Sequence, residues 1–203
     1  MRLLVIDGRD IARHASLMDE AFRLRHRIFV EELGWERLRK PDGREIDQFD
    51  VETARHFLIL DERDNLRVYT RLLPTQWPHL LSDAYPQLAP RGIPRGPQIW
   101  EWTRLAIDPK YRGDGSWSRG SGEMARAVVE HCLANGIEQM TWEGHPVWVT
   151  RFLEMGFWPT PLGPITDIDG GPVIAGVMDV TPDVLDGFAG RGIAATPLHA
   201  VMA

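Results

Sequence analysis

Cysteine, lysine and long apolar runs are scarce in this chain, and each shortage removes a class of protein. Cys132 is the only cysteine, so an internal disulfide is excluded and a thiolate metal site has poor support. No uninterrupted apolar run approaches the length needed to cross a membrane. The first residues, MRLLVIDGRD, become charged before the apolar core of a signal peptide could form. We therefore expect a soluble, cytoplasmic protein with no membrane partner.

Positive charge is also limited, which narrows the choice of ligands. The net charge is −6, whereas a nucleic-acid binder needs a basic face that follows the phosphates. Only Lys40 and Lys110 are lysines, so nearly every cation is a guanidinium, a group suited to bidentate contacts with carboxylates or phosphates. From Glu123 onward, three basic side chains stand against ten acidic ones. Basic function is therefore expected in the first half, and no spacing typical of metal ligands is found.

The chain reads as a single domain covering residues 1–203, with the segment after about residue 181 peripheral. Strands are predicted at residues 1–6, at ARHFLILD, LRVYTRLL and IWEWTRLAI, at residues 137–142 and at VIAGVMDV. Helices are predicted at residues 16–34, from the glycine-rich loop to Gly136, and at residues 146–156. The long Pro- and Gly-rich connection at residues 74–97 is of a length often used for functional lids. This order predicts an α/β fold with mixed strand pairing.

The helix at residues 16–34 combines an apolar face with a charged residue. The apolar stripe is formed by Met18, Phe22, Phe29 and Leu33. Arg25 falls at helical spacing within this stripe, so it should point inward, where a guanidinium needs a partner. The carboxylates of Asp47 and Asp50 follow, and Trp35 stands beside the glycine that ends the helix. The segment from Arg25 to Asp50 therefore predicts a binding site.

The second half has the order strand, glycine-rich loop, helix, strand, helix and then the letters MGF. This order resembles the acyltransferase fold of the GNAT superfamily, which implies a three-layer α-β-α sandwich around a mixed central sheet. In that superfamily the loop amides receive the pyrophosphate of a pantetheine thioester donor. Here the loop RGDGSWSRGSG begins with Arg112 and Gly113. Because glycine-rich loops are common, the loop alone is a weak signal.

Several separated motifs, taken together, resemble the LuxI-type acyl-homoserine lactone synthases, which make quorum-sensing signals. The motifs are LRHRIFVEELGW, EIDQFD, ARHFL, VYTRLLPT and WEWTRLAI, and the resemblance covers roughly residues 25–156. It implies an acyltransferase that needs no cofactor besides its two substrates. In the family reaction the amine of S-adenosylmethionine attacks an acyl thioester, and the product then closes to a lactone and releases methylthioadenosine.

The resemblance implies roles for individual residues. Binding of S-adenosylmethionine is expected from Arg25, Phe29, Trp35, Asp47, Asp50 and Arg71. Carboxylates and aromatic rings suit its sulfonium and ammonium groups, and a guanidinium suits its carboxylate. Catalysis is expected from Glu101, Thr103 and Arg104, with Glu101 as the base that acts directly or through a water. Thr103 stands where many members have serine, and a backbone amide of the same strand could stabilise the oxyanion.

Four other interpretations remain open from the sequence. The charged residues could form a structural ion-pair network, which is also compatible with a binding site. Phe29 is as consistent with a core position as with a ligand contact. The chain could instead be a generic GNAT N-acetyltransferase acting on another amine, or a non-catalytic ligand-binding member of the fold.

The acyl donor is expected to be a coenzyme A thioester. Glu154 stands where a basic residue is expected in members that dock an acyl carrier protein, and the second half is acidic. The chain is therefore more similar to the acyl-CoA-dependent branch, the isovaleryl- or aryl-homoserine lactone synthases, and a carrier protein is disfavoured. The bulk of Trp102, Trp142 and Trp148 near the expected acyl pocket favours a short, branched or aromatic acyl group.

Overall fold

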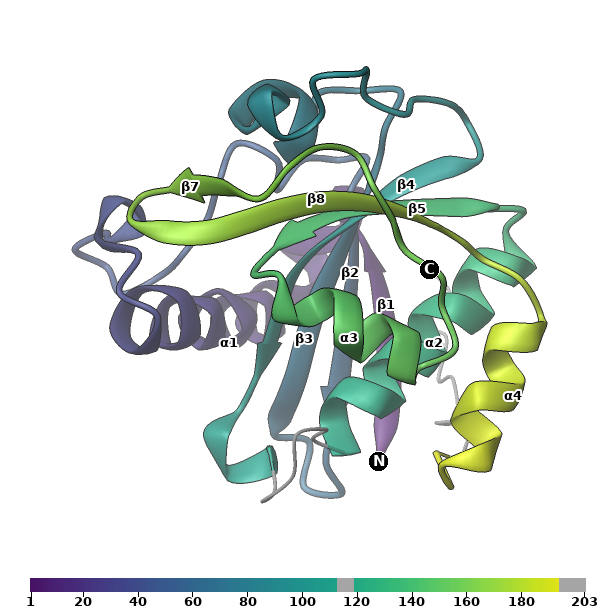
Figure 1. Cartoon of the computed structure of the whole chain (residues 1–203). Coiled ribbons are helices and arrows are strands. Elements are labelled where there is room, and N and C mark those ends of the chain that lie inside the picture. Colours follow the sequence, from purple (N-terminus) through teal and green to yellow (C-terminus); the bar gives the residue numbers. More distant parts are fainter. Residues whose placement is uncertain (113–118, 194–203) are drawn as a thin grey trace. The chain divides into compact units, whose positions relative to one another are not determined.

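The computed structural model describes residues 1–112 and 119–193, apart from the side chain of Arg119 (Figure 1). The strands are β1 (Arg2–Asp7), β2 (Arg55–Leu60), β3 (Leu66–Pro74), β4 (Ile99–Ile107), β5 (Gln139–Gly144), β6 (Thr160–Pro161), β7 (Thr166–Ile168) and β8 (Gly171–Asp179). Hydrogen-bonded neighbours follow the order β1-β2-β3-β4-β5-β8-β6, and β7 pairs with β8. β4 and β5 are parallel, whereas β1–β2 and β5–β8 are antiparallel. The expected mixed sheet is confirmed.

Helices and single turns connect these strands. The α-helices are α1 (Ala15–Arg25), α2 (Arg119–Ala134), α3 (Val147–Glu154) and α4 (Asp183–Gly190). The 3₁₀ and π segments are η1 (Gly8–His14), η2 (His26–Glu32), η3 (Glu36–Leu38), η4 (Leu80–Ala84), η5 (Pro86–Leu88) and η6 (Pro109–Tyr111). None of the helices in the described part of the chain has the length and apolar character that crossing a bilayer requires.

The described residues form two compact units. The first contains residues 1–71, 104–112 and 119–127, and the second contains residues 72–103 and 128–193. β3, β4 and α2 each contribute residues to both units.

In the first unit, α1 and η2 pack on the sheet through the predicted apolar stripe. Met18 and Phe22 are buried together with alternating side chains of β1 and β2. The predicted helix is present, but its last two turns are the π-helical η2, in which the Leu33 amide bonds the Ile28 carbonyl at 3.0 Å. This wider turn shifts the residues that follow around the helix axis. Leu33 is therefore 56% exposed, and its expected place on the buried stripe is wrong.

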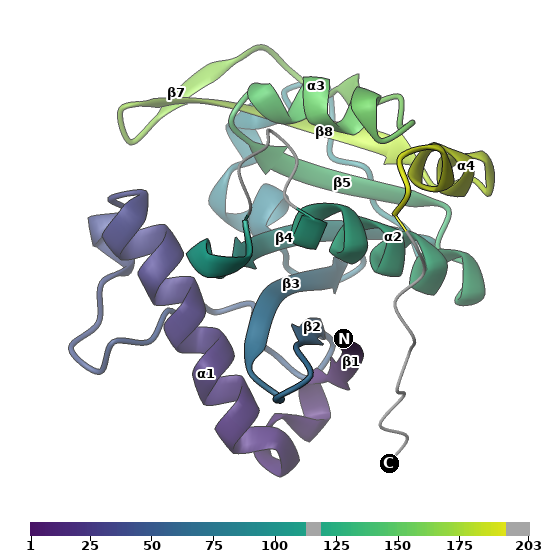
Figure 2. The same ribbon diagram turned by 90° about the horizontal axis from the view of Figure 1, so that it is seen from below.

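Helices cover both faces of β3 in the first unit. Tyr69 belongs to the core on the α1 side. Its neighbour Val68 points the other way, toward α2, where a Cβ on Gly120 would lie 2.8 Å from the Val68 side chain. Gly120 is thus required for the close approach of α2. Figure 2 shows the resulting layers, and the expected α-β-α arrangement is confirmed.

In the second unit, α3 and α4 supply aromatic side chains to the core. Phe152 of α3 packs beside Phe157, which in turn contacts Phe188 of α4. The segment after Thr181, expected to be peripheral, thus forms a helix with a fully buried phenylalanine. Cys132 is buried, as expected, and burial raises the pKa of its thiol to about 12.

The long connection before β4 is a packed part of the second unit. Leu81, Leu88 and Ala89 form a hydrophobic cluster with Ala175 of β8. All four side chains are at least 95% buried. In this structure the connection expected as a lid therefore contributes to the core, and its polypeptide backbone reaches the site described below.

Candidate active site

Three guanidiniums and three carboxylates meet in the first unit. They belong to Arg25 of α1, Arg71 of β3, Arg104 of β4, and Glu45, Asp47 and Asp50 of the segment between η3 and β2. Two contacts anchor this segment: the Glu45 amide donates to the Phe22 carbonyl at 3.0 Å, and Lys40 Nζ donates to the Ile46 carbonyl. The sequence-predicted Arg25, Asp47, Asp50, Arg71 and Arg104 are thus brought together.

The inner part of this cluster is closed to solvent. Arg25 and Arg71 are both fully buried. Asp50 Oδ1 accepts from both of them, at 2.7 Å from Arg25 Nη1 and 2.6 Å from Arg71 Nη1. Arg71 also holds Asp47 with two bonds of 2.6 and 3.0 Å, a bidentate contact. These residues form a rigid base for the outer part.

The outer part consists of Arg104, Asp47 and Glu45. Arg104 Nη2 lies 2.8 Å from Asp47 Oδ2, and the side chains are 8% and 12% exposed. Arg104 also contacts both oxygens of Glu45, at 3.2 and 3.3 Å. Its backbone has φ of 59°, a left-handed conformation inside a strand that few non-glycine residues adopt. Among the ion pairs of the cluster, Arg104–Asp47 is the one in which both side chains are partly exposed.

The charges of the cluster balance one another. Burial alone would raise the pKa values of Glu45, Asp47 and Asp50, but the guanidiniums beside them hold all three below their usual range. The three carboxylates are therefore ionised at neutral pH, and the three arginines compensate them. A ligand can enter this site without unbalanced charge only if it replaces an ion pair or brings both signs.

An aromatic stack borders the outer arginine. The Phe29 and Trp35 rings are stacked with centroids 5.1 Å apart, and Arg104 Cζ lies 5.6 Å from the Phe29 centroid. Phe29 is buried, so it serves the core as well as the site, whereas Trp35 is 41% exposed. The Trp35 amide donates to the Phe29 carbonyl at 2.9 Å, which fixes the turn after η2. The exposed ring of Trp35 offers an aromatic face to a cation.

The second unit contains the predicted base. Glu101 of β4 is fully buried, and its two oxygens accept from the backbone amides of Leu80 at 2.8 Å and Leu81 at 2.7 Å. Two amide donors favour the ionised carboxylate, the form that can take up a proton. The π-helical turn η4 thus holds Glu101 in position. Thr103 is 5% exposed on the same strand.

The tryptophans of the expected acyl pocket surround one phenylalanine. Trp102, Trp142 and Trp148 have ring centroids 5.7, 4.9 and 5.7 Å from that of Phe152. A Cβ on Gly176 of β8 would meet the Trp142 indole at 2.8 Å, so a glycine is needed where this ring lies on the neighbouring strand. The three predicted tryptophans are therefore neighbours in one aromatic cluster of the second unit.

The remaining predicted residues lie on the loop before α2. Arg112 Nη1 forms an ion pair with Glu32 at 2.7 Å in the first unit, and both side chains are more than 30% exposed. Gly113 lies outside the described residues. Within the described ranges, no group of three or more His, Cys, Asp or Glu side chains is arranged to hold a metal ion.

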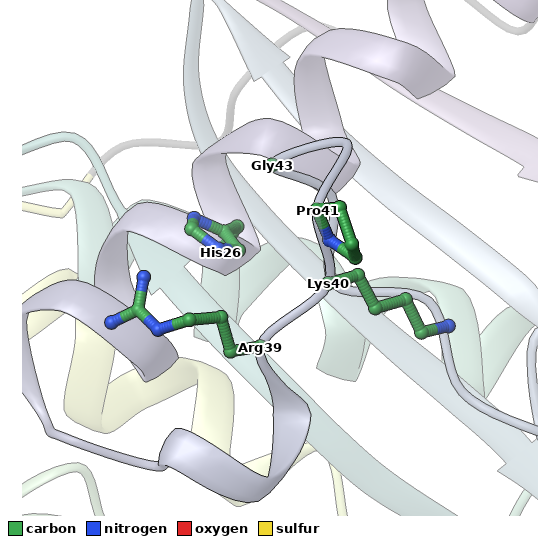
Figure 3. Close-up of a pocket in the computed structure, with 5 residues that line it drawn as sticks. All are labelled: His26, Arg39, Lys40, Pro41 and Gly43. Atoms are coloured by element: carbon green, nitrogen blue, oxygen red, sulfur yellow. The ribbon is translucent and has the colours of Figure 1, made fainter.

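The first unit also has a surface cleft, formed by residues outside the guanidinium cluster. It is lined by His26, Arg39, Lys40, Pro41 and Gly43 (Figure 3). The His26 ring, one residue after the buried Arg25, faces the loop that carries Arg39 and Pro41. The Arg39 guanidinium is engaged by Glu36 through two bonds of 2.6 and 2.7 Å. We assign no ligand to this cleft.

Three members of the site were missed in the sequence. Glu45 links Arg25 to Arg104, and its only signal was its place two residues before Asp47 in an extended segment, where both side chains point the same way. Tyr69 donates to or accepts from two partners: its hydroxyl lies 3.3 Å from Arg25 Nη1 and 2.7 Å from His56 Nδ1. Neither His56 nor Tyr69 stood out from the apolar strand around it.

Known proteins resemble this chain over most of its length. A family model described as Autoinducer synthase matches residues 10–140. The isovaleryl-homoserine lactone synthase of Bradyrhizobium diazoefficiens is 39% identical over 174 residues, which cover 85% of this chain and 77% of that protein. The solved structure of BjaI, a CoA-dependent acyl-homoserine lactone synthase with SAM and isopentyl-CoA, has a TM-score of 0.90 at 34% identity, covering 99% of this chain and 93% of that one.

A more distant likeness defines the fold. A putative N-acetyltransferase from Lactobacillus plantarum has a TM-score of 0.58 at 20% identity and covers 89% of this chain and 100% of that one. The architecture is therefore the GNAT-like acyltransferase fold, as expected. Within that fold, the chain belongs to the autoinducer synthase family.

Proposed function

We propose that this chain is an acyl-homoserine lactone synthase that makes a quorum-sensing signal from S-adenosylmethionine and an acyl thioester. In the first step the α-amine attacks the thioester carbonyl, an amide bond forms, and the C–S bond of the thioester breaks to release the thiol. In the second step the carboxylate oxygen attacks the γ-carbon, the carbon–sulfonium bond breaks, and methylthioadenosine leaves. The lactone is then complete, and no oxidant or reductant is needed.

The observation that supports this proposal best is the accessible ion pair on a buried, neutral cluster. The amino-acid end of S-adenosylmethionine carries an ammonium and a carboxylate, the same two charges that Arg104 and Asp47 present to each other. Exchange of this pair for two protein–substrate pairs keeps every charge compensated. In this proposal Arg104 takes the substrate carboxylate and Asp47 the ammonium. The Phe29–Trp35 stack beside Arg104 takes the sulfonium through cation–π attraction.

The buried residues have a supporting role. Arg25, Arg71 and Asp50 are closed to solvent, so we assign them the positioning of Glu45 and Asp47 rather than direct substrate contact. Such support is what keeps a binding site in a productive geometry.

Glu101 is the proposed general base for the first step. Each carboxylate offers about four acceptor sites, and the amides of Leu80 and Leu81 occupy two of them. In this proposal the Glu101 carboxylate receives the amine proton directly or through a water. Thr103 is proposed as a further catalytic residue of the same strand.

We propose acyl-CoA as the donor, with a short, branched or aromatic acyl group. The likeness to an isovaleryl-homoserine lactone synthase and to a CoA-dependent enzyme supports this choice. The acidic composition after Glu123 disfavours an acidic carrier protein. The bulk of the aromatic cluster of Trp102, Trp142, Trp148 and Phe152 favours a compact acyl group. Arg112 and Gly113 remain candidates for the donor pyrophosphate, and the cytoplasm, where both substrates are made, is the proposed location.

The deciding experiment mixes purified protein with S-adenosylmethionine and a panel of acyl-CoAs. The panel contains short branched, aromatic and long linear chains, and each acyl group is also supplied on acyl carrier protein. Methylthioadenosine release and the mass of the lactone are measured. We expect product with short branched or aromatic acyl-CoAs, and faster turnover with coenzyme A than with the carrier protein. Turnover with the carrier protein alone would remove the donor proposal and leave the reaction in place.

Two variants separate this reaction from the alternatives. Glu101→Gln should lower turnover by about 10²- to 10⁴-fold. Glu138→Gln, at an exposed glutamate next to β5, should leave it unchanged. Acetyl-CoA turnover on other amines without methylthioadenosine would favour a generic N-acetyltransferase. Unchanged product formation by Glu101→Gln would rule out Glu101 as the base, and binding without turnover would favour a non-catalytic member.

A further inference from the structure

A buried hydrogen-bond relay lies behind the guanidinium cluster. His56 of β2 and Tyr69 of β3 are both fully buried. The Tyr69 hydroxyl lies between His56 Nδ1, at 2.7 Å, and Arg25 Nη1, at 3.3 Å. The Arg25 Cζ atom also lies 5.5 Å from the centre of the Tyr69 ring. Tyr69 therefore contacts the Arg25 guanidinium with both its oxygen and its ring face.

The chemistry of Arg25, Tyr69 and His56 determines which atom carries each proton of the relay. A guanidinium only donates, so the Tyr69 oxygen accepts from Arg25. The Tyr69 O–H then donates to His56 Nδ1, which leaves the imidazole proton on Nε2. Burial lowers the pKa of His56 to about 3 and raises the pKa of Tyr69 well above its usual range. Both groups stay neutral at physiological pH, and the Tyr69 lone pairs remain turned toward Arg25.

This relay carries a cost that the core does not require. His56 Nε2 is buried and has no hydrogen-bond partner among the described residues. An unsatisfied buried donor lowers stability, and two apolar side chains at positions 56 and 69 would avoid that cost. The polar pair therefore points to a role at the cluster it contacts.

Arg25 connects the relay to every other charge of the cluster. Its Nε donates to Glu45, which also pairs with Arg104. Its Nη1 donates to Asp50, which also pairs with Arg71. A rotation of the Arg25 guanidinium would move both carboxylates, so whatever fixes Arg25 fixes the accessible pair as well.

We propose that His56 and Tyr69 are positioning residues for the S-adenosylmethionine site, acting through the guanidinium of Arg25. This inference rests on the proposed function. It assigns no substrate contact to either residue. Loss of the relay should weaken S-adenosylmethionine binding and spare the acyl donor.

Four variants test the relay. Tyr69→Phe deletes only the hydroxyl, and His56→Leu removes the acceptor. Each should raise the KM for S-adenosylmethionine about 10-fold, the effect of losing one hydrogen bond to a charged group. The KM for acyl-CoA should stay within about twofold. His56→Asn retains an acceptor oxygen near the Nδ1 position and should restore most of the affinity.

The double variant separates function from stability. His56→Leu with Tyr69→Phe removes the unpaired polar groups together, so it should unfold at a urea concentration no lower than either single variant. Its KM for S-adenosylmethionine should nevertheless match that of the single variants, because all three break one relay. Phe57→Leu is the control: Phe57 is a buried neighbour on β2, and its truncation should lower stability without changing that KM.

Binding of S-adenosylmethionine without an acyl donor, measured by calorimetry, distinguishes the failure of this proposal from that of the proposed reaction. Weaker binding to Tyr69→Phe, with no lactone formed by the wild type, would retain the relay and remove the reaction. Lactone formation with a KM for S-adenosylmethionine unchanged in Tyr69→Phe would overturn the relay and retain the reaction. A rise in both KM values that follows the loss of stability would also overturn it.

Discussion

A single substitution in the guanidinium cluster leaves a charge without a partner, whereas the exchange proposed for the substrate does not. Arg71 compensates Asp47 and Asp50 in a region closed to solvent. Its replacement by a neutral residue would leave a buried carboxylate uncompensated, a loss typically of about 3 to 5 kcal/mol. Exchange of the Arg104–Asp47 pair for contacts with a zwitterion leaves no carboxylate uncompensated. Loss of one charge by mutation therefore destabilises the cluster, whereas binding of a zwitterion leaves its charges paired.

The buried histidine gives the protein a specific pH dependence. Burial holds the pKa of His56 at about 3 in the folded protein, whereas an unfolded histidine has a pKa of about 6.5. Below pH 6.5 the unfolded state binds one more proton than the folded state. The stability contribution of neutral His56 is therefore fully present above pH 6.5 and is lost as the pH falls toward 3. From pH 7 to pH 5 the free energy of unfolding should fall by about 2 kcal/mol. Urea denaturation at pH 7, 6 and 5 measures it.

His56→Asn is the control for this window, because it removes the titrating group and keeps a hydrogen-bond acceptor. The carboxylates of the cluster also have lowered pKa values. Their stability contribution is present above an unfolded pKa of about 4 and is lost below it, outside the window. An equally steep loss between pH 7 and 5 in His56→Asn would show that another group is responsible.

At the scale of elements, the strands were predictable and the irregular turns were not. The strand IWEWTRLAI was predicted from its residue pattern, and the structure places β4 over the same residues. By contrast, the π-helical turn η4 depends on a tertiary contact. The Leu80 and Leu81 amides are directed by Glu101, some twenty residues later, and no local pattern encodes that contact. Glu45 was missed for the same reason, since its arginine partners come from distant elements.

The packing of β8 on β5 gives a prediction for one glycine. Gly176→Ala would place a Cβ 2.8 Å from the Trp142 indole, so the ring or the strand must shift. The free energy of unfolding should fall by about 1 to 3 kcal/mol, the usual cost of overpacking a core. Urea denaturation at pH 7 measures this loss.

Gly171→Ala on the same strand is the matched control. Its Cβ would have no neighbour nearer than 3.9 Å, so the change should stay within about 0.5 kcal/mol. Equal effects of the two substitutions would mean that the contact with Trp142 does not constrain β8. A helix or strand propensity effect would appear in both variants alike.

At the scale of the whole molecule, the proposed reaction draws on both compact units. The residues assigned to S-adenosylmethionine belong to the first unit and Glu101 to the second. β4 carries functional residues in each, with Arg104 in the first unit and Glu101 in the second. The sequence order of these residues was enough to predict the family and the fold. The sequence did not predict which of these side chains are buried and support the site and which are partly exposed at its edge. That distinction depends on their three-dimensional contacts.

A ligand for the first unit should stabilise the folded chain. Methylthioadenosine at about 100 times its Kd should add about 2.7 kcal/mol to the free energy of unfolding. For a chain of this length the Tm should rise by about 5 to 10 °C, measured by calorimetry. Arg104→Met should not change this rise if Arg104 contacts only the substrate carboxylate, which methylthioadenosine lacks, whereas the protection by S-adenosylmethionine should be lost.

Arg13→Met is the control for this prediction. Arg13 forms a solvent-exposed ion pair with Asp10 at 3.6 Å and takes no part in the ion pairs of the cluster. Both ligands should protect this variant as they protect the wild type. Equal protection of Arg104→Met by the two ligands would contradict the role proposed for Arg104.

The left-handed backbone at Arg104 has a consequence for evolution. A non-glycine residue in this conformation costs about 1 kcal/mol or more that glycine would not. Glycine would remove that cost, but it would also take a guanidinium away from Glu45 and Asp47, which is the larger loss. The fold itself therefore retains the arginine. A lineage that no longer uses the signal would still carry Arg104, so this residue alone does not reveal whether a descendant still signals.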